Sequence, residues 1–91
     1  MNLPHTLTIQ KPLDHGQGTV TQLVFDREPV AGDFFDLPPT GWSNGDYGLI
    51  VSRLTGQPLP VIKRLSLPDF REAILLVESF LNVGREIGGE S

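Results

Sequence analysis

The chain has 91 residues, 7 of them Lys or Arg and 11 Asp or Glu, which gives a formal net charge of −4 at pH 7. This length predicts one domain with one modest core, too small to enclose a deep active-site cavity as well. The acidic balance and the scattered basic residues argue against binding to nucleic acid or to an anionic membrane surface, and the absence of cysteine excludes disulfides and thiolate metal sites.

Neither a secretion signal nor a membrane span is evident. The first residues show no basic stretch followed by an apolar one, so we expect no signal peptide. The longest strongly apolar run, residues 73–77, is far shorter than the roughly 20 residues that a membrane helix requires. We therefore expect a cytoplasmic protein, and the lack of cysteine is compatible with a reducing compartment.

The first third of the chain predicts a β-hairpin. Residues 6–10 alternate polar and apolar side chains, as a half-buried strand does, and Pro12 is expected to end that strand. Residues 13–18 are a turn cluster with two glycines, and residues 19–25 form the second strand. Its alternation slips once, which predicts a bulge near residues 21–22. The inward positions are Leu7, Ile9, Val20, Leu23 and Phe25.

Capping and breaking residues predict helices after the hairpin. Pro29 suits the first turn of a short helix. The pairs Ser43/Asp46 and Ser66/Asp69 resemble capping boxes with a shorter acid, and each precedes apolar residues at helical spacing. The expected ranges are 29–37, 44–55 closed by Gly56, 60–65 and 67–83, the last being the longest.

Together these elements predict an α+β domain, an N-terminal two-stranded β-hairpin packed against three or four short helices. We expect one domain over residues 1–91, ordered from about residue 6 to residue 83, with a flexible tail at 84–91.

The residue types needed for catalysis or metal binding are present without the spacing that such chemistry requires. His5 and His15 have no third or fourth ligand spaced to complete a metal site. The two helix-capping serines lack the G-x-S-x-G context of a nucleophile. Asp33 and Asp36 are expected to lie in solvent on the first helix rather than to form an acid–base pair. We therefore expect no catalytic residue, no metal, no cofactor and no enzymatic activity.

Apolar side chains exceed what one contact surface needs. On the last helix, one apolar stripe is expected to face the rest of the domain, formed by Leu67, Phe70, Ile74, Val77 and Leu81, and Ala73, Leu76 and Phe80 widen it. Phe34 and Phe35 are adjacent, so both cannot point inward. The excess either belongs to the core or forms a surface for a helical partner or for self-association. The candidate partner-binding residues are Phe35, Trp42, Leu75 and Phe80.

An ordered set of segments resembles a known family. These segments are LTIQKPL at residues 7–13, VTQLVF at 20–25, REP at 27–29, AGD at 31–33, LIVSRLTGQP at 49–58 and LSLPDF at 65–70. In this order and spacing, the chain resembles the phage tail assembly chaperones of Mu-like and P2-like myophages, the short product of a frameshifted gene pair. The resemblance runs from about residue 6 to residue 81 and departs from the family at residues 38–42, where a more helical connection is expected.

The resemblance implies a function in protein binding. Such chaperones are not enzymes; they bind the helical tape measure protein, keep it soluble while the tail assembles in the bacterial host cytoplasm, and are missing from the mature virion. A longer form made by ribosomal frameshifting is a further implied partner. No partner-contacting residue is carried over from the family. The alternatives are another phage tail structural or connector protein retained in the virion and a DNA-binding regulator.

Overall fold

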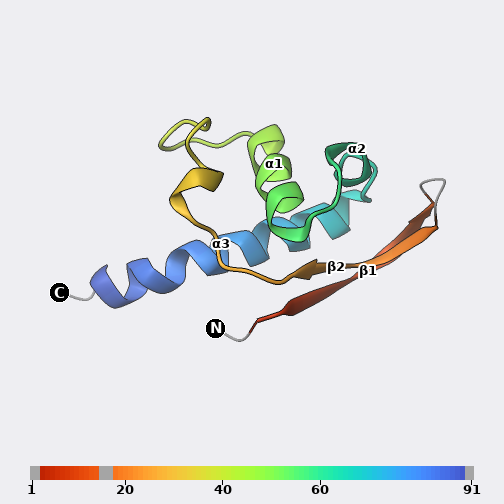
Figure 1. Cartoon of the computed structure of the whole chain (residues 1–91), viewed down its shortest axis with the longest axis horizontal. Coiled ribbons are helices and arrows are strands. Elements are labelled where there is room, and N and C mark those ends of the chain that lie inside the picture. Colours follow the sequence, from red (N-terminus) through yellow and green to blue (C-terminus); the bar gives the residue numbers. More distant parts are fainter. Residues whose placement is uncertain (1–2, 15–17, 90–91) are drawn as a thin grey trace.

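A computed structural model describes residues 3–14 and 18–89 of the chain, with residues 82–89 described by their backbone alone. It shows the predicted α+β fold, a two-stranded hairpin followed by helices (Figure 1). The elements are β1 His5–Asp14, β2 Thr19–Phe25, a 3-10 turn η1 Ala31–Asp33, α1 Asn44–Thr55, α2 Leu59–Ile62 and α3 Leu67–Gly89.

The antiparallel hairpin is longer and less regular than predicted. The paired positions run from His5–Phe25 to Thr8–Gln22 and resume at Leu13–Val20. Between these blocks, residues 9–12 of β1 stand opposite Thr21 alone, so the extra residues lie in β1 and not in β2. Pro12 does not end the strand, because it lies in this irregular stretch, where its missing N–H breaks no regular pairing. His15 lies outside the described residues.

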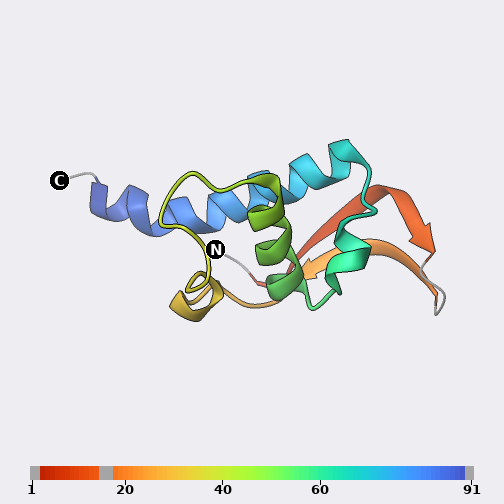
Figure 2. The same ribbon diagram turned by 90° about the horizontal axis from the view of Figure 1, so that it is seen from above.

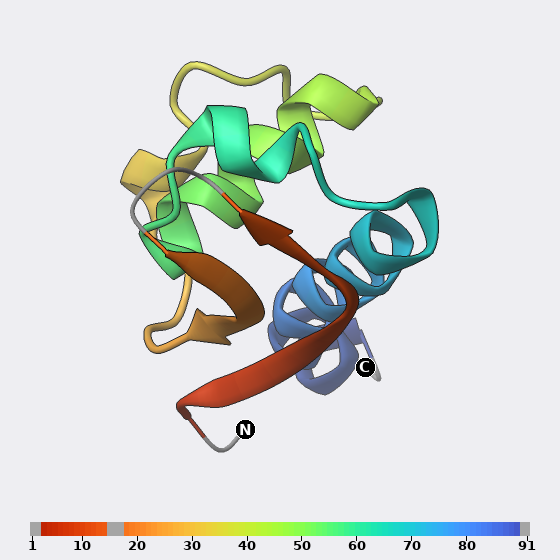
Figure 3. The same cartoon turned by 90° about the vertical axis from the view of Figure 1, so that its right-hand side faces the viewer.

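The core lies where the hairpin meets the helices. Figure 3 shows α3 end-on, with the hairpin against one side of it and α1 and α2 against another. The buried apolar side chains are Ile9, Val20, Leu23, Phe25, Ile50, Val51, Leu54, Val61, Ile62, Leu65, Ala73, Val77 and Phe80. Among residues 67–81 of α3 the buried apolar positions are therefore Ala73, Val77 and Phe80, whereas Leu67, predicted to belong to the apolar stripe, is 57% exposed.

The connection between β2 and α1 contains the main error of the sequence prediction. Instead of a helix over residues 29–37, only the 3-10 turn η1 forms. Within this turn the Asp33 side chain accepts the backbone N–H of Val30 at 2.8 Å. Asp33 is buried rather than solvated, because Arg27 pairs with both of its carboxylate oxygens, at 2.8 and 2.9 Å. In Figure 2 this connection, gold to yellow-green, loops away from the hairpin.

A second arginine fastens the same connection to α1. Arg53 donates to both carboxylate oxygens of Asp36, at 2.7 and 2.9 Å, and to the backbone carbonyl of Asp33 at 2.6 Å. The hydrogen bonds from Arg27 and from Arg53 hold the pKa of Asp33 and the pKa of Asp36, respectively, below the usual range. Asp36 itself stays exposed, as expected.

The predicted limits of α1 are confirmed. The Ser43 N–H donates to Asp46 Oδ2 at 2.9 Å, and the Asp46 N–H donates to Ser43 Oγ at 3.2 Å, which completes a capping box. Gly56 closes the helix with φ of 77°, a left-handed conformation that favours glycine.

At the start of α3, Asp69 does more than cap the helix. Its own N–H donates to Ser66 Oγ at 3.3 Å, as predicted, and its carboxylate accepts the Ser66 hydroxyl at 2.8 Å. The carboxylate also accepts the backbone N–H groups of Gln10 at 2.8 Å and Lys11 at 3.1 Å. These residues belong to the irregular stretch of β1, so Asp69 satisfies N–H groups that the interrupted pairing leaves free.

The last helix extends beyond its predicted end. We expected Gly84 to stop it, but α3 continues to Gly89. Glycine inside a helix costs only about 1 kcal/mol relative to alanine, and no proline follows to terminate the helix. Residues 90–91, the end of the expected flexible tail, lie outside the described residues.

Candidate protein-binding surface

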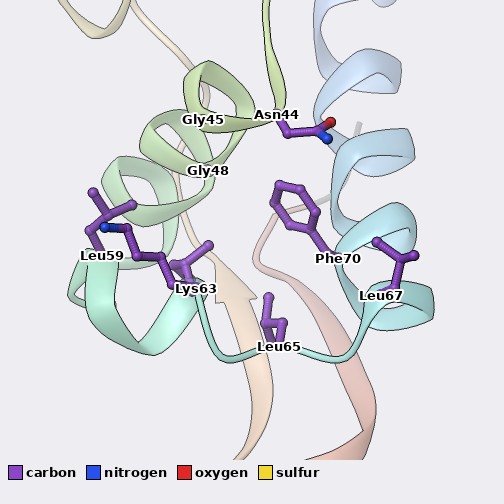
Figure 4. A pocket seen from close by; sticks show the side chains of 9 residues that line it. Asn44, Gly45, Gly48, Leu59, Lys63, Leu65, Leu67 and Phe70 are labelled. Carbon is purple, nitrogen blue, oxygen red and sulfur yellow. The ribbon is translucent and has the colours of Figure 1, made fainter.

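An apolar groove of about 340 Å³ lies between the first half of α1, α2 and the start of α3 (Figure 4). Apart from Lys63, the side chains that line it carry no charge. Phe70 projects from α3 into the space in front of α1, and Leu65 points into it from the segment that joins α2 to α3. Leu67 stands at the rim, more than half exposed, and Lys63 points away from the groove.

On the α1 side of this groove, two of the lining residues are glycines, Gly45 and Gly48, which have no side chain. A Cβ at Gly48 would meet Ile62 Cγ2 and Leu59 Cδ1, each at 3.8 Å, which is ordinary van der Waals contact. A Cβ at Gly45 would meet only Ser43 Oγ, at 3.6 Å. Packing therefore does not require glycine at either position, although glycine in a helix interior costs about 1 kcal/mol relative to alanine. Neither glycine has a side chain that would narrow the groove.

The structure separates the four partner-binding residues predicted from the sequence. Phe35 is 85% exposed and follows η1, and Leu75 is 59% exposed on α3. Trp42 is half-buried in the connection before α1. Phe80 was predicted on an exposed surface, but it is a core residue, only 8% exposed, and its ring lies 5.8 Å from that of Phe25. Burial removes Phe80 from any surface open to a partner in this conformation.

Trp42 and Leu75 line two other, separate recesses. Leu75 lines a shallow recess of about 250 Å³ together with His5 and Leu7 of β1. Trp42 lines another, of about 370 Å³, together with Tyr47 and Glu78. The predicted residues thus lie in different surroundings and do not form one contiguous patch.

Sequence reasoning missed the residues of the groove. Leu65 was assigned to the expected short helix over residues 60–65, and Leu67 and Phe70 to the apolar stripe of the last helix, so nothing indicated that they line a groove. The signal that could have revealed the groove is the pair Gly45 and Gly48, spaced to fall near one face of an otherwise well-capped helix. Glycine inside a helix is less favourable than alanine, so two glycines on one face call for an explanation.

The described residues offer little for other kinds of site. Within residues 3–14 and 18–81, no three or more His, Asp or Glu side chains are gathered so that they could hold a metal ion. None of the helices described has both the length and the apolar character required to cross a bilayer.

Fold and surface together define a small acidic α+β domain with an open apolar groove, the kind of surface that accepts side chains of a partner helix. The chain has no significant match among protein-family models, curated proteins or solved structures.

Proposed function

We propose that this chain is a non-enzymatic phage tail assembly chaperone that binds the tape measure protein and keeps it soluble in the host cytoplasm until the tail tube encloses it. The observation that carries the proposal is the apolar groove, left open by Gly45 and Gly48 and flanked by the exposed Leu67. The ordered segments that resemble the chaperone family support the same function.

The groove has the chemistry to hold apolar side chains of an amphipathic helix. Its lining is almost entirely apolar, and helix-in-groove binding places side chains spaced three or four residues apart into such a surface. A groove of about 340 Å³ takes only a few aliphatic side chains, so a single contact is weak. Copies bound by such weak contacts along a long helical partner can be displaced one at a time.

The charge of the domain supports solubilisation as well as binding. With a net charge of −4, each bound copy adds negative charge to the complex. Coated tape measure chains therefore repel one another instead of associating through their apolar faces.

Co-expression with the tape measure protein of the same phage tests the proposal. We expect that protein to become soluble and to co-purify with this chain. Gly45→Leu adds a side chain at the groove and should abolish co-purification, whereas Gly45→Ala leaves most of the space open and should preserve it. Circular dichroism of both variants confirms that the fold is retained.

Three results would contradict the proposal. One is a tape measure protein that stays insoluble with both this chain and its longer frameshifted form. Another is undiminished binding by Gly45→Leu, which would exclude the groove as the binding site. The third is detection of this chain by mass spectrometry of purified virions, which would favour a tail structural or connector protein.

A further inference from the structure

A second recess, on another part of the surface, combines aromatic rings with a carboxylate. It has a volume of about 370 Å³ and lies between the connection that precedes α1, α1 itself and α3. Its chemically distinctive side chains are those of Trp42, Tyr47 and Glu78, and Leu81 adds an apolar contribution. This composition differs from that of the apolar groove, so we consider its ligand separately.

The aromatic part of the recess is held in place by its neighbours. The indole of Trp42 stacks on Phe34, with ring centroids 5.4 Å apart and planes within 5° of parallel. Its Nε1–H donates to the backbone carbonyl of Pro38 at 2.7 Å. Tyr47 meets the indole edge-on, with a centroid distance of 5.5 Å and an interplanar angle of 79°. The rings are therefore positioned before any ligand arrives, which lowers the entropy lost on binding.

The carboxylate is fixed beside these rings. Glu78 Oε2 accepts the Tyr47 hydroxyl at 2.8 Å, a bond that joins α1 to α3. This hydrogen bond raises the pKa of Tyr47 above its ordinary value, because it favours the protonated phenol. A carboxylate attracts a cation by direct Coulomb attraction, and the π-system of a nearby aromatic ring attracts it through the ring quadrupole.

We propose that this recess binds the side chain of an arginine presented by a partner protein. A planar guanidinium can lie against an aromatic ring while its N–H groups pair with a carboxylate, and it is more weakly hydrated than a lysine ammonium. The proposal goes beyond the tail chaperone function and does not depend on it.

A small probe tests the recess directly. N-acetyl-arginine amide is titrated into the 15N-labelled chain at constant ionic strength, with the neutral isostere N-acetyl-citrulline amide as the comparison. Trp42 is the only tryptophan, so its indole N–H gives a single, assignable signal. We expect a saturable shift of that signal, with the arginine probe binding about tenfold more tightly than the citrulline probe, given the strength of exposed cation–π and ion-pair contacts.

Two variants at matched positions make the test specific. Glu78→Gln retains an oxygen that accepts the Tyr47 hydroxyl but removes the charge, and we expect it to weaken the arginine probe about tenfold. Glu72→Gln removes a carboxylate that lies on the same helix but lines a different recess. Binding of the arginine probe should be unchanged in this variant. Equal binding of the arginine and citrulline probes, or undiminished binding by Glu78→Gln, would overturn the proposal. Equal binding of N-acetyl-lysine amide would overturn its restriction to arginine.

Discussion

Replacing Asp69 by asparagine should weaken the whole fold, because one carboxylate holds both a helix start and an interrupted strand. The side chain is 2% exposed and accepts hydrogen bonds from the backbone N–H groups of Gln10 and Lys11 and from the Ser66 hydroxyl. Asparagine keeps the shape, but its amide nitrogen cannot accept, so one backbone N–H, that of Lys11 in the best arrangement, loses its partner.

The expected loss follows from that one bond. A hydrogen bond to a charged acceptor contributes about 1.5–3 kcal/mol, so we expect Asp69→Asn to lower the free energy of unfolding by about 2 kcal/mol. For a domain of this size, such a loss lowers Tm by about 8–16 °C. Urea and thermal denaturation followed by circular dichroism measure both values. Asp14→Asn is the control, because the Asp14 side chain is exposed and its carboxylate accepts the Thr19 hydroxyl at 2.8 Å, a bond that the asparagine oxygen can keep, so its effect should stay within about 0.5 kcal/mol.

The effect of Asp69→Asn should also depend on pH in a defined direction. Burial by itself raises the pKa of Asp69, but the hydrogen bonds from Gln10, Ser66 and Lys11, with the charge of Lys11, outweigh burial and leave the pKa below the usual range. A lowered pKa in the folded state means that the carboxylate stabilises the fold above about pH 4, the unfolded value, and that this contribution is lost as the pH falls through the folded value. The difference between wild type and variant should therefore shrink below pH 4. A neutral-pH difference under about 0.5 kcal/mol would refute the role assigned to Asp69.

The remaining predictions use the same urea denaturation measurement. Arg27→Gln should cost about 2 kcal/mol, because a buried carboxylate loses its bidentate partner; an unchanged midpoint would contradict this. Gly48→Ala should raise the free energy of unfolding by about 0.5–1 kcal/mol, since the new methyl group makes ordinary contacts inside a helix. Gly56→Ala should lower it by about 1–2 kcal/mol, because residue 56 has a positive φ. Phe80→Ala should cost about 3–5 kcal/mol and Phe35→Ala less than about 0.5 kcal/mol. Similar effects at the two phenylalanines would contradict their placement.

Local signals in the sequence were sufficient wherever neighbours along the chain decide the structure. The boundaries of α1 depend on Ser43, Asp46 and Gly56, all of which act within one turn of the helix end. The inward positions of β2 follow from its apolar pattern in the same way. These elements could be predicted, because their main determinants lie within a few residues of them.

Long-range partners account for the errors. Nothing near Asp33 in the sequence indicates that Arg53 will approach its carbonyl from a later helix, so a helix over 29–37 was the natural prediction. In β1, Pro12 was expected to end the strand, yet the strand continues and Asp69, far along the chain, satisfies the adjacent N–H groups. Sequence pattern alone does not identify such partners.

The surface was predicted less well than the core. Apolar side chains at helical spacing look the same whether a neighbour covers them or not, which is why Phe80 was placed on the surface and Leu67 in the core. The groove arises from the relative placement of three helices, and no single helix encodes it. Of the four predicted surface residues, Phe35 and Leu75 are exposed, and Trp42 lies at a recess of a different chemical character.

The connection between β2 and α1 has a consequence for hydrogen exchange. Outside the short turn η1 it has no helix or strand. It is attached to the rest of the protein by the hydrogen bonds of Arg53 to Asp33 and Asp36, and by side chains such as Phe34 and Leu37 that pack against the core. Such a segment can detach and reattach as a unit while the hairpin and helices stay folded. Its amide protons should then exchange through a local opening of lower free energy than global unfolding, and Arg53→Gln should speed their exchange without changing that of the core of α3.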